Sequence, residues 1–171
     1  MNTLSLPSSV DPRPLLETAG VRMGGAEWYQ EHILPQVSRT FALTIPQLPA
    51  RLRRIVANAY LLCRAADTID DDAALESGEK RRYENALVDV VTGRRGAGEF
   101  AAEIFPRLSP LTLAAERDLM RRLPQVIALT RSFDPVPRAT IERCLSTMCR
   151  GMHHFHCRTG VHGLATMRDL D

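Results

Sequence analysis

Four aspartates lie within six positions of the segment RAADTIDDD (64–72), directly after an apolar stretch. If a helix continues through this segment, Asp67, Asp70 and Asp71 take positions i, i+3 and i+4 on one face. Arg64 lies one turn earlier. Carboxylates this close repel one another, and near a helix C-terminus they also oppose the helix dipole. A divalent cation would offset both costs, and Mg²⁺ binds carboxylates together with substrate phosphates. The segment is therefore a candidate magnesium site, and a solvated acidic helix end is the alternative.

The segment HHFHC (153–157), together with His162, is a candidate zinc site. His153 and His156 are three residues apart, and His153 and Cys157 are four apart, so they share a helix face. A zinc site needs three or four convergent ligands, however, and no second cluster in the sequence completes this one. We expect the histidines to lie at a cavity rim or on the surface instead.

Pairs of adjacent arginines recur along the chain and could favour phosphates or an anionic membrane. The net charge of +2 is too small to indicate nucleic acid as a partner, so we expect these pairs on solvated helix faces. The sequence has no GxSxG or GxGxxG pattern that would favour a serine nucleophile or a glycine-rich nucleotide loop. The pairs are Arg53/Arg54, Arg81/Arg82, Arg94/Arg95 and Arg121/Arg122.

Apolar residues recur at helical spacing, and no segment with strand-like alternation stands out, which predicts an all-α chain. The strongest helix begins near Pro49, since proline suits a first helical turn. The basic run RLRR (51–54) is expected on its solvent face. The predicted apolar stripe of this helix is Leu52, Ile55, Val56, Ala59, Tyr60, Cys63 and Ala66.

Proline and glycine bound the other expected elements. A short helix over 26–34 should stop at Pro35, because proline breaks the helical hydrogen-bond pattern. A helix over 111–132 should kink at Pro124, and the segment FDPVP (133–137) should form a break. The remaining expected elements are a mixed segment over 38–45, a helix over 79–91, a loop over 93–98, and a helix over 137–158 with a buried stripe at Ile141, Leu145, Met148, Met152 and Phe155.

The 171 residues suffice for one domain with a core. Residues 1–24 show no periodicity and are expected to form a mobile arm. The four cysteines form no CxxC pair, which is typical of reduced thiols in a cytosolic protein. No secretory signal is visible, and no apolar run approaches the roughly 20 residues that span a bilayer. We expect a cytoplasmic protein, with peripheral membrane contact as an option.

Three separated segments, VSRTFALTIPQLP (37–49), NAYLLCRAADTIDDD (58–72) and CRGMHHF (149–155), together resemble the squalene/phytoene synthase family of head-to-head prenyl transferases. The resemblance covers about residues 25–171 and is nearest to the squalene synthases. It implies an all-α prenyl synthase bundle around an apolar cavity, with two aspartate motifs that hold Mg²⁺ on diphosphates. It also implies that two farnesyl or geranylgeranyl diphosphates are joined through a cyclopropyl intermediate, which squalene synthases reduce with NADPH.

The resemblance assigns roles to individual residues. Asp67 and Asp71 match the outer carboxylates of the first aspartate motif, and Asp70 matches an acidic position between them, so the three are the expected metal ligands. Arg64 and Tyr60 complete the expected catalytic set with these two outer carboxylates. The other matches bind the diphosphate or line its pocket: Ser38, Arg39, Arg64 and Tyr60.

The chain stops at Asp171, before the tyrosine-rich stretch and second aspartate motif that the resemblance leads one to expect. The resemblance therefore implies the N-terminal part of an enzyme, inactive alone, which self-associates or needs the missing helices. The first candidate function is Mg²⁺-dependent condensation to squalene or a related C30 or C40 product such as phytoene. The second is a non-catalytic prenyl-diphosphate-binding or partner subunit, and the third is a helical module with an acidic surface patch.

Overall fold

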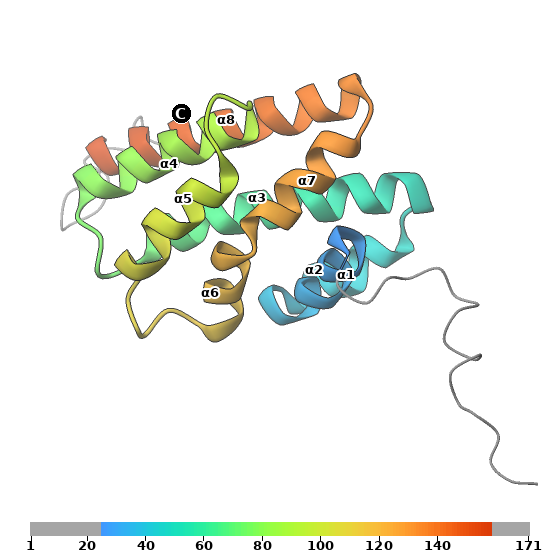
Figure 1. Ribbon diagram of the computed structural model, residues 1–171, viewed down its shortest axis with the longest axis horizontal. Helices are drawn as coiled ribbons and strands as arrows, with labels where there is room; N and C mark the ends of the chain where they lie inside the picture. Colours follow the sequence, from blue (N-terminus) through green and yellow to red (C-terminus); the bar gives the residue numbers. More distant parts are fainter. Residues whose placement is uncertain (1–24, 159–171) are drawn as a thin grey trace, which may run out of the picture.

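The computed structural model describes residues 25–158, with side chains up to Phe155, and this part of the chain contains helices and no strand. The all-α prediction is therefore confirmed (Figure 1). The predicted arm at 1–24 lies outside the described residues. In chain order the elements are α1 (Ala26–Val37), α2 (Arg39–Thr44), η2 (Ile45–Gln47), α3 (Ala50–Asp71), α4 (Ser77–Val91), α5 (Ala97–Ile104), η3 (Phe105–Arg107), α6 (Ala114–Arg121), α7 (Leu123–Ser132) and α8 (Pro135–Arg158).

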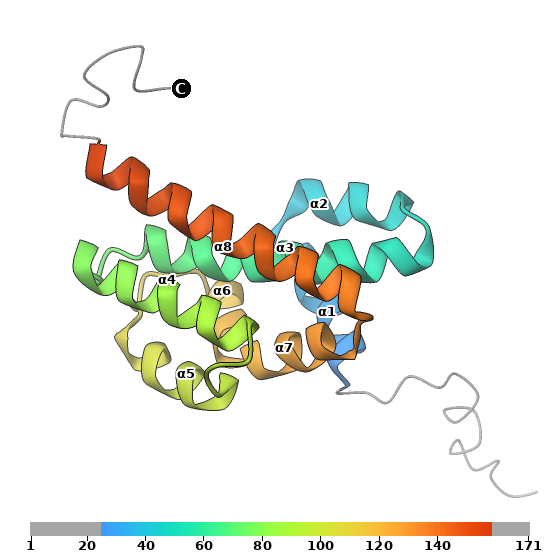
Figure 2. The ribbon, with the colours of Figure 1, turned by 90° about the horizontal axis from the view of Figure 1, so that it is seen from above.

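The long helix α3 lies at the centre of the bundle. It packs against α1, α4, α6, α7 and α8, and Figure 2 shows α8 running across it. Pro49 caps its N-terminus and it continues through Asp71, as the sequence predicts. The fully buried Asn58 donates from Nδ2 to the carbonyl of Val126 (3.1 Å) and accepts from the hydroxyl of Thr130 (2.8 Å). These two bonds tie α3 to α7.

The buried face of α3 differs from the predicted stripe. Ala66 is buried as predicted, but Leu52 is 46% exposed and Tyr60 is only half-buried. The reason is that α3 carries apolar residues on two adjacent faces, and its neighbours in the described part of the chain fully cover only one of them. The residues on the covered face are Ala57, Asn58, Leu61, Leu62, Ala65, Ala66, Thr68 and Ile69.

Helix α1 does not stop at Pro35, so this prediction is wrong. The helix continues to Val37, and the amide of Ser38 still donates to the carbonyl of Leu34 (3.0 Å). Proline removes one intrahelical bond but its fixed φ is helical, and here burial of Leu34 and Val37 holds the last turn in place. The segment expected as mixed is the short helix α2, in which the Ser38 hydroxyl caps the N-terminus by accepting from the amide of Phe41 (3.1 Å).

The breaks between the later helices lie close to the predicted prolines. The helix predicted over 111–132 is divided into α6 and α7 at Arg122, and Pro124 occupies the first turn of α7. Helix α8 begins at Pro135, so the predicted break is shorter than FDPVP. The predicted loop at 93–98 contains Gly93 at φ +82°, a conformation that favours glycine, but α5 already begins at its end and was not predicted.

The predicted stripe of α8 is confirmed in part. Ile141 and Leu145 are buried, Met148 is half-buried, and Phe155 is 53% exposed. Helix α4 agrees with its predicted range to within two residues. No helix in the described part of the chain combines the length and the apolar character that membrane crossing requires.

Candidate functional site

The candidate residues of α3 form a row along one side of the helix. Tyr60, Arg64, Asp67 and Asp71 occupy positions i, i+4, i+7 and i+11, which keeps them on adjacent turns of one face over roughly 16 Å. All four are half-buried or exposed, in contrast to the core face of the same helix. The row therefore lies at the margin of the core, and Tyr60 still packs against it.

An arginine between two carboxylates forms the centre of this row. Nη2 of Arg64 is 2.5 Å from a carboxylate oxygen of Glu116, which lies in the first turn of α6. Nη1 of Arg64 is 3.8 Å from Asp67 Oδ2, too far for a hydrogen bond. Nε of Arg64 is buried and has no hydrogen-bond partner. The guanidinium is thus held on one edge only.

The acidic end of the row has an excess of negative charge. Burial is the largest cause that raises the pKa of Asp67 above its ordinary value. The Arg64 charge opposes this rise, whereas the neighbouring carboxylates of Asp71, Asp70 and Glu116 add to it. A bound cation would favour the ionised form of Asp67 and reverse the balance.

The donor set at this end fits a shared magnesium site. Asp67 and Asp71 offer carboxylate oxygens from successive turns, and Asp70 is half-buried beside them. Among residues 25–155, no group of three or more His, Cys, Asp or Glu side chains could hold a metal ion by itself. Two carboxylates suit a cation that takes its other ligands from phosphate and water, as Mg²⁺ commonly does.

The fourth aspartate of the run has a structural role that the sequence analysis missed. Asp72 is 3% exposed, and its carboxylate accepts from the amides of Ala74 (2.8 Å) and Ser109 (3.0 Å) and from the hydroxyl of Thr112 (2.6 Å). These bonds join the end of α3 to the segment that precedes α6. Nothing in the run of identical residues distinguishes Asp72, because the partners that join it to another segment, Ser109 and Thr112, lie 37 and 40 residues away.

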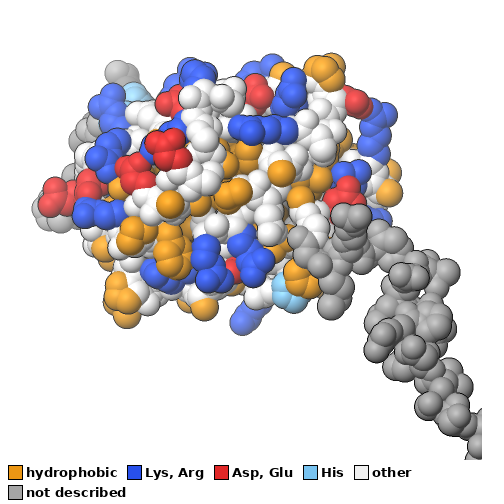
Figure 3. Space-filling view, in the orientation of Figure 1, with side chains coloured by type: hydrophobic (Ala, Val, Ile, Leu, Met, Phe, Trp, Pro, Cys, Tyr) orange, Lys and Arg blue, Asp and Glu red, His pale blue; other side chains and the backbone are white. Residues whose placement is uncertain are grey.

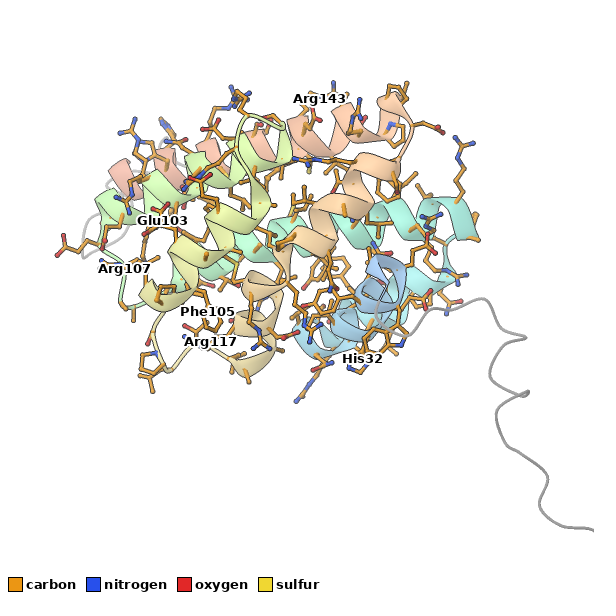
Figure 4. All side chains as sticks on the ribbon, in the orientation of Figure 1. His32, Glu103, Phe105, Arg107, Arg117 and Arg143 are labelled. Atoms are coloured by element: carbon orange, nitrogen blue, oxygen red, sulfur yellow. The ribbon has the colours of Figure 1, made fainter. Side chains whose placement is uncertain are left out.

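The segment before α6 is also held from its other side. Nη1 of Arg117 donates to the carbonyls of Leu108 (3.1 Å) and Ser109 (2.8 Å). The same guanidinium lies 4.8 Å from the ring centre of Phe105, and both side chains are labelled in Figure 4. Two independent sets of contacts therefore fix the entry into α6.

A pocket of about 200 Å³ opens beside the acidic end of the row. Asp71, Thr68 and Glu116 line it, together with Thr112 from the segment before α6. Carboxylates and hydroxyls from three parts of the chain thus share one concave surface. The sequence pointed to Asp71 but not to Glu116, which looks like one more charge on a solvated helix.

The other end of the row lies beside the turn between α1 and α2. The Tyr60 hydroxyl donates to the carbonyl of Val37 (3.3 Å), and its ring lies 4.6 Å from the ring of Phe41. Val37 and Phe41 flank Ser38 and Arg39, so these predicted diphosphate residues lie near Tyr60. Arg39 is exposed, whereas the Ser38 hydroxyl is used as a helix cap. About two turns of α3 separate this end from Asp67.

The zinc candidate cannot be assembled from the described side chains. His153 is half-buried on α8, whereas His156, Cys157 and His162 lie outside the residues whose side chains are described. The cysteines that are described, Cys63, Cys144 and Cys149, are free thiols.

Each predicted arginine pair contributes at least one ion pair on the surface. All of these arginines are exposed except Arg95, which is half-buried. Figure 3 shows arginine and acidic side chains interspersed over one face of the molecule. One ion pair from each arginine pair is Arg54–Glu27 (2.5 Å), Arg82–Glu103 (3.5 Å), Arg94–Asp89 (2.7 Å) and Arg121–Asp118 (2.8 Å).

The chain is similar to known proteins over most of its length. Residues 34–171 match the family model for squalene/phytoene synthase. A squalene synthase from Botryococcus braunii is 31% identical over 128 residues, covering 72% of this chain and 24% of the relative. Lycopaoctaene synthase from the same organism is 31% identical over 129 residues, with 72% and 26% covered.

A shorter match of higher identity links the chain to a squalene synthase from Solanum lycopersicum. It is 48% identical over 48 residues, which are 28% of this chain and 12% of the relative. The chain spans about a quarter of the length of the Botryococcus relatives. Because the family model covers most of the chain, including every candidate residue, the chain belongs to the squalene/phytoene synthase family.

Proposed function

We propose that this chain supplies the first aspartate motif and one diphosphate-binding wall of an enzyme that joins two prenyl diphosphates head to head. The product would be squalene from farnesyl diphosphate, or a related C30 or C40 hydrocarbon such as phytoene. The observation that carries the proposal is the row of Tyr60, Arg64, Asp67 and Asp71 on the exposed side of α3, in a chain that belongs to this family.

The residues of the row have distinct proposed roles. Asp67 and Asp71, with Asp70 beside them, would hold Mg²⁺ against the diphosphate. When bound, Mg²⁺ would supply positive charge that stabilises the diphosphate as a leaving group. Arg64 and Arg39 would donate hydrogen bonds to phosphate oxygens, since a guanidinium can hold two of them at once.

The remaining residues would orient the substrate near the other end of the row. Tyr60 and Phe41 offer an aromatic surface beside the Ser38 turn, where the prenyl chain could leave the charged region. If squalene is the product, NADPH would be required as reductant. We place the protein in the cytoplasm or at a membrane surface, with further helices or a second chain closing the cavity.

Titration calorimetry tests this proposal by measuring how farnesyl thiodiphosphate binds with and without Mg²⁺. We expect binding that depends on Mg²⁺ and falls about tenfold or more in Asp67→Asn, because one charged ligand is lost. Asp134→Asn is the control, since Asp134 pairs with Arg51 (2.6 Å) at the far end of α3. If the affinity for farnesyl thiodiphosphate changes neither on removal of Mg²⁺ nor in Asp67→Asn, the acidic row is only a surface patch.

A further inference from the structure

Glu116 is an acidic residue of α6 whose side chain reaches the row on α3. Its side chain is 12% exposed, and it contacts Arg64 Nη2 at 2.5 Å from the first turn of α6. An arginine has five N–H donors in a planar fork, and one carboxylate oxygen occupies only one of them. Nη1 remains beyond hydrogen-bond distance of Asp67. Nη1 of Arg64 is therefore available beside Asp67, whereas Nε is buried.

The position of Glu116 is fixed by the contacts that hold the entry into α6. Asp72 binds the amide of Ser109 and the hydroxyl of Thr112, and Arg117 binds the Ser109 carbonyl. These bonds set where α6 begins, and Glu116 lies three residues into that helix. The carboxylate is thus carried by a segment that is braced independently of Arg64.

We propose that Glu116 is a positioning residue for the diphosphate, because it holds the Arg64 guanidinium with Nη1 free beside Asp67. This inference rests on the proposed function. A free arginine side chain samples many rotamers, and fixing it before the ligand arrives lowers the entropic cost of binding. Glu116 acts through Arg64 and does not itself contact phosphate.

Glu116 could affect diphosphate binding through its negative charge or through its hold on Arg64. These two effects predict opposite outcomes for the same substitutions, which makes the inference testable. Glu116 adds a negative charge near an anionic ligand, so on charge alone every neutral substitution should tighten binding. Positioning predicts instead that Glu116→Ala weakens binding, while Glu116→Gln preserves it. Glutamine has the same shape and still offers an acceptor oxygen to Nη2.

The experiment is calorimetric titration of the chain with inorganic pyrophosphate in Mg²⁺. We expect about tenfold weaker binding in Glu116→Ala, the order of magnitude that one freed side chain costs. Glu116→Asp, which is one methylene too short to reach Arg64, should be equally impaired, and it carries the test if the alanine variant does not fold. Glu116→Gln should bind within about threefold of the wild type or more tightly.

Glu103→Ala is the matched control. It also removes a carboxylate from arginines, but its partners Arg82 and Arg95 lie outside the row. We expect pyrophosphate binding by this variant to equal that of the wild type. Equal loss in Glu103→Ala would mean that any broken ion pair weakens binding, and the role assigned to Glu116 would be wrong.

A spectroscopic measurement separates this inference from the proposed function. In the free chain, the ¹⁵N-edited signals of the Arg64 guanidinium should show restricted rotation in the wild type and in Glu116→Gln, and averaged rotation in Glu116→Ala. If the wild type binds no pyrophosphate, the proposed function fails, and these signals still decide whether Glu116 fixes Arg64. Tighter binding by both neutral variants, equal loss in both, or unchanged Arg64 signals would each overturn the inference.

Discussion

At the scale of single residues, burial divides the described cysteines into two groups. Burial is the main cause that raises the pKa of Cys63 and Cys149 to about 12, whereas Cys144 on α8 is exposed. Only the thiolate reacts with alkylating agents. At about pH 8 we therefore expect iodoacetamide to modify Cys144 well before Cys63 and Cys149, as read by peptide mass mapping.

The same raised pKa values determine the direction in which the stability of the protein changes with pH. Folding disfavours the thiolates of Cys63 and Cys149, so stability should fall as pH rises above the ordinary thiol range and toward 12.

The control for the iodoacetamide experiment is the same labelling in denaturant, where all cysteines should react alike. Equal rates in the native chain would contradict the raised pKa values of Cys63 and Cys149.

At the scale of helices and their connections, the last two aspartates of RAADTIDDD should behave differently. Asp72→Ala would leave the buried Ser109 amide and the Thr112 hydroxyl without their partner, which should cost about 3 kcal/mol in the free energy of unfolding. Asp71→Ala exposes no such group and should change stability by less than about 0.5 kcal/mol. Urea unfolding of the two variants measures both values, and equal losses would refute the structural role of Asp72.

The elements also show what can be predicted from sequence and what cannot. Periodic apolar residues located α3, α4 and α8 because helical spacing is a local property. The end of α1 was placed wrongly at Pro35, since tertiary burial of Val37 outweighs one lost hydrogen bond. The core face of α3 was misjudged because two apolar faces are present, and only packing decides which one is covered. The contacts of Asp72 with Ser109 and of Arg64 with Glu116 are non-local, so no spacing rule points to them.

At the scale of the whole molecule, the described helices leave the row of site residues half-buried or exposed. Large apolar side chains of α2 and α3 are also open to solvent, including Phe41 and Leu52, each 46% exposed, and Leu43 at 74%. The stripe of α8 does not add to this surface, because Ile141 and Leu145 are buried. We expect the chain to self-associate through the open apolar surface, which sedimentation velocity would detect.

The same open geometry predicts that the chain alone makes no hydrocarbon. Incubation with farnesyl diphosphate, Mg²⁺ and NADPH should give no C30 product by gas chromatography, because a carbocation formed beside open solvent would be captured by water. A full-length squalene synthase, such as the relative from Botryococcus braunii, is the positive control under the same conditions. Squalene produced by a monodisperse monomer of this chain would show that this account of the site is wrong.

The contact between Arg64 and Glu116 has a consequence for the order of folding. The two residues are 52 positions apart, and Asp72 and Ser109 are 37 apart, so the segment that carries α4 and α5 must be closed into a loop before either contact can form. Helix α3 can nucleate early from local contacts, but loop closure delays the arrangement of its charged groups. A peptide that carries the whole aspartate motif would therefore fold as a helix without acquiring the electrostatics of the site.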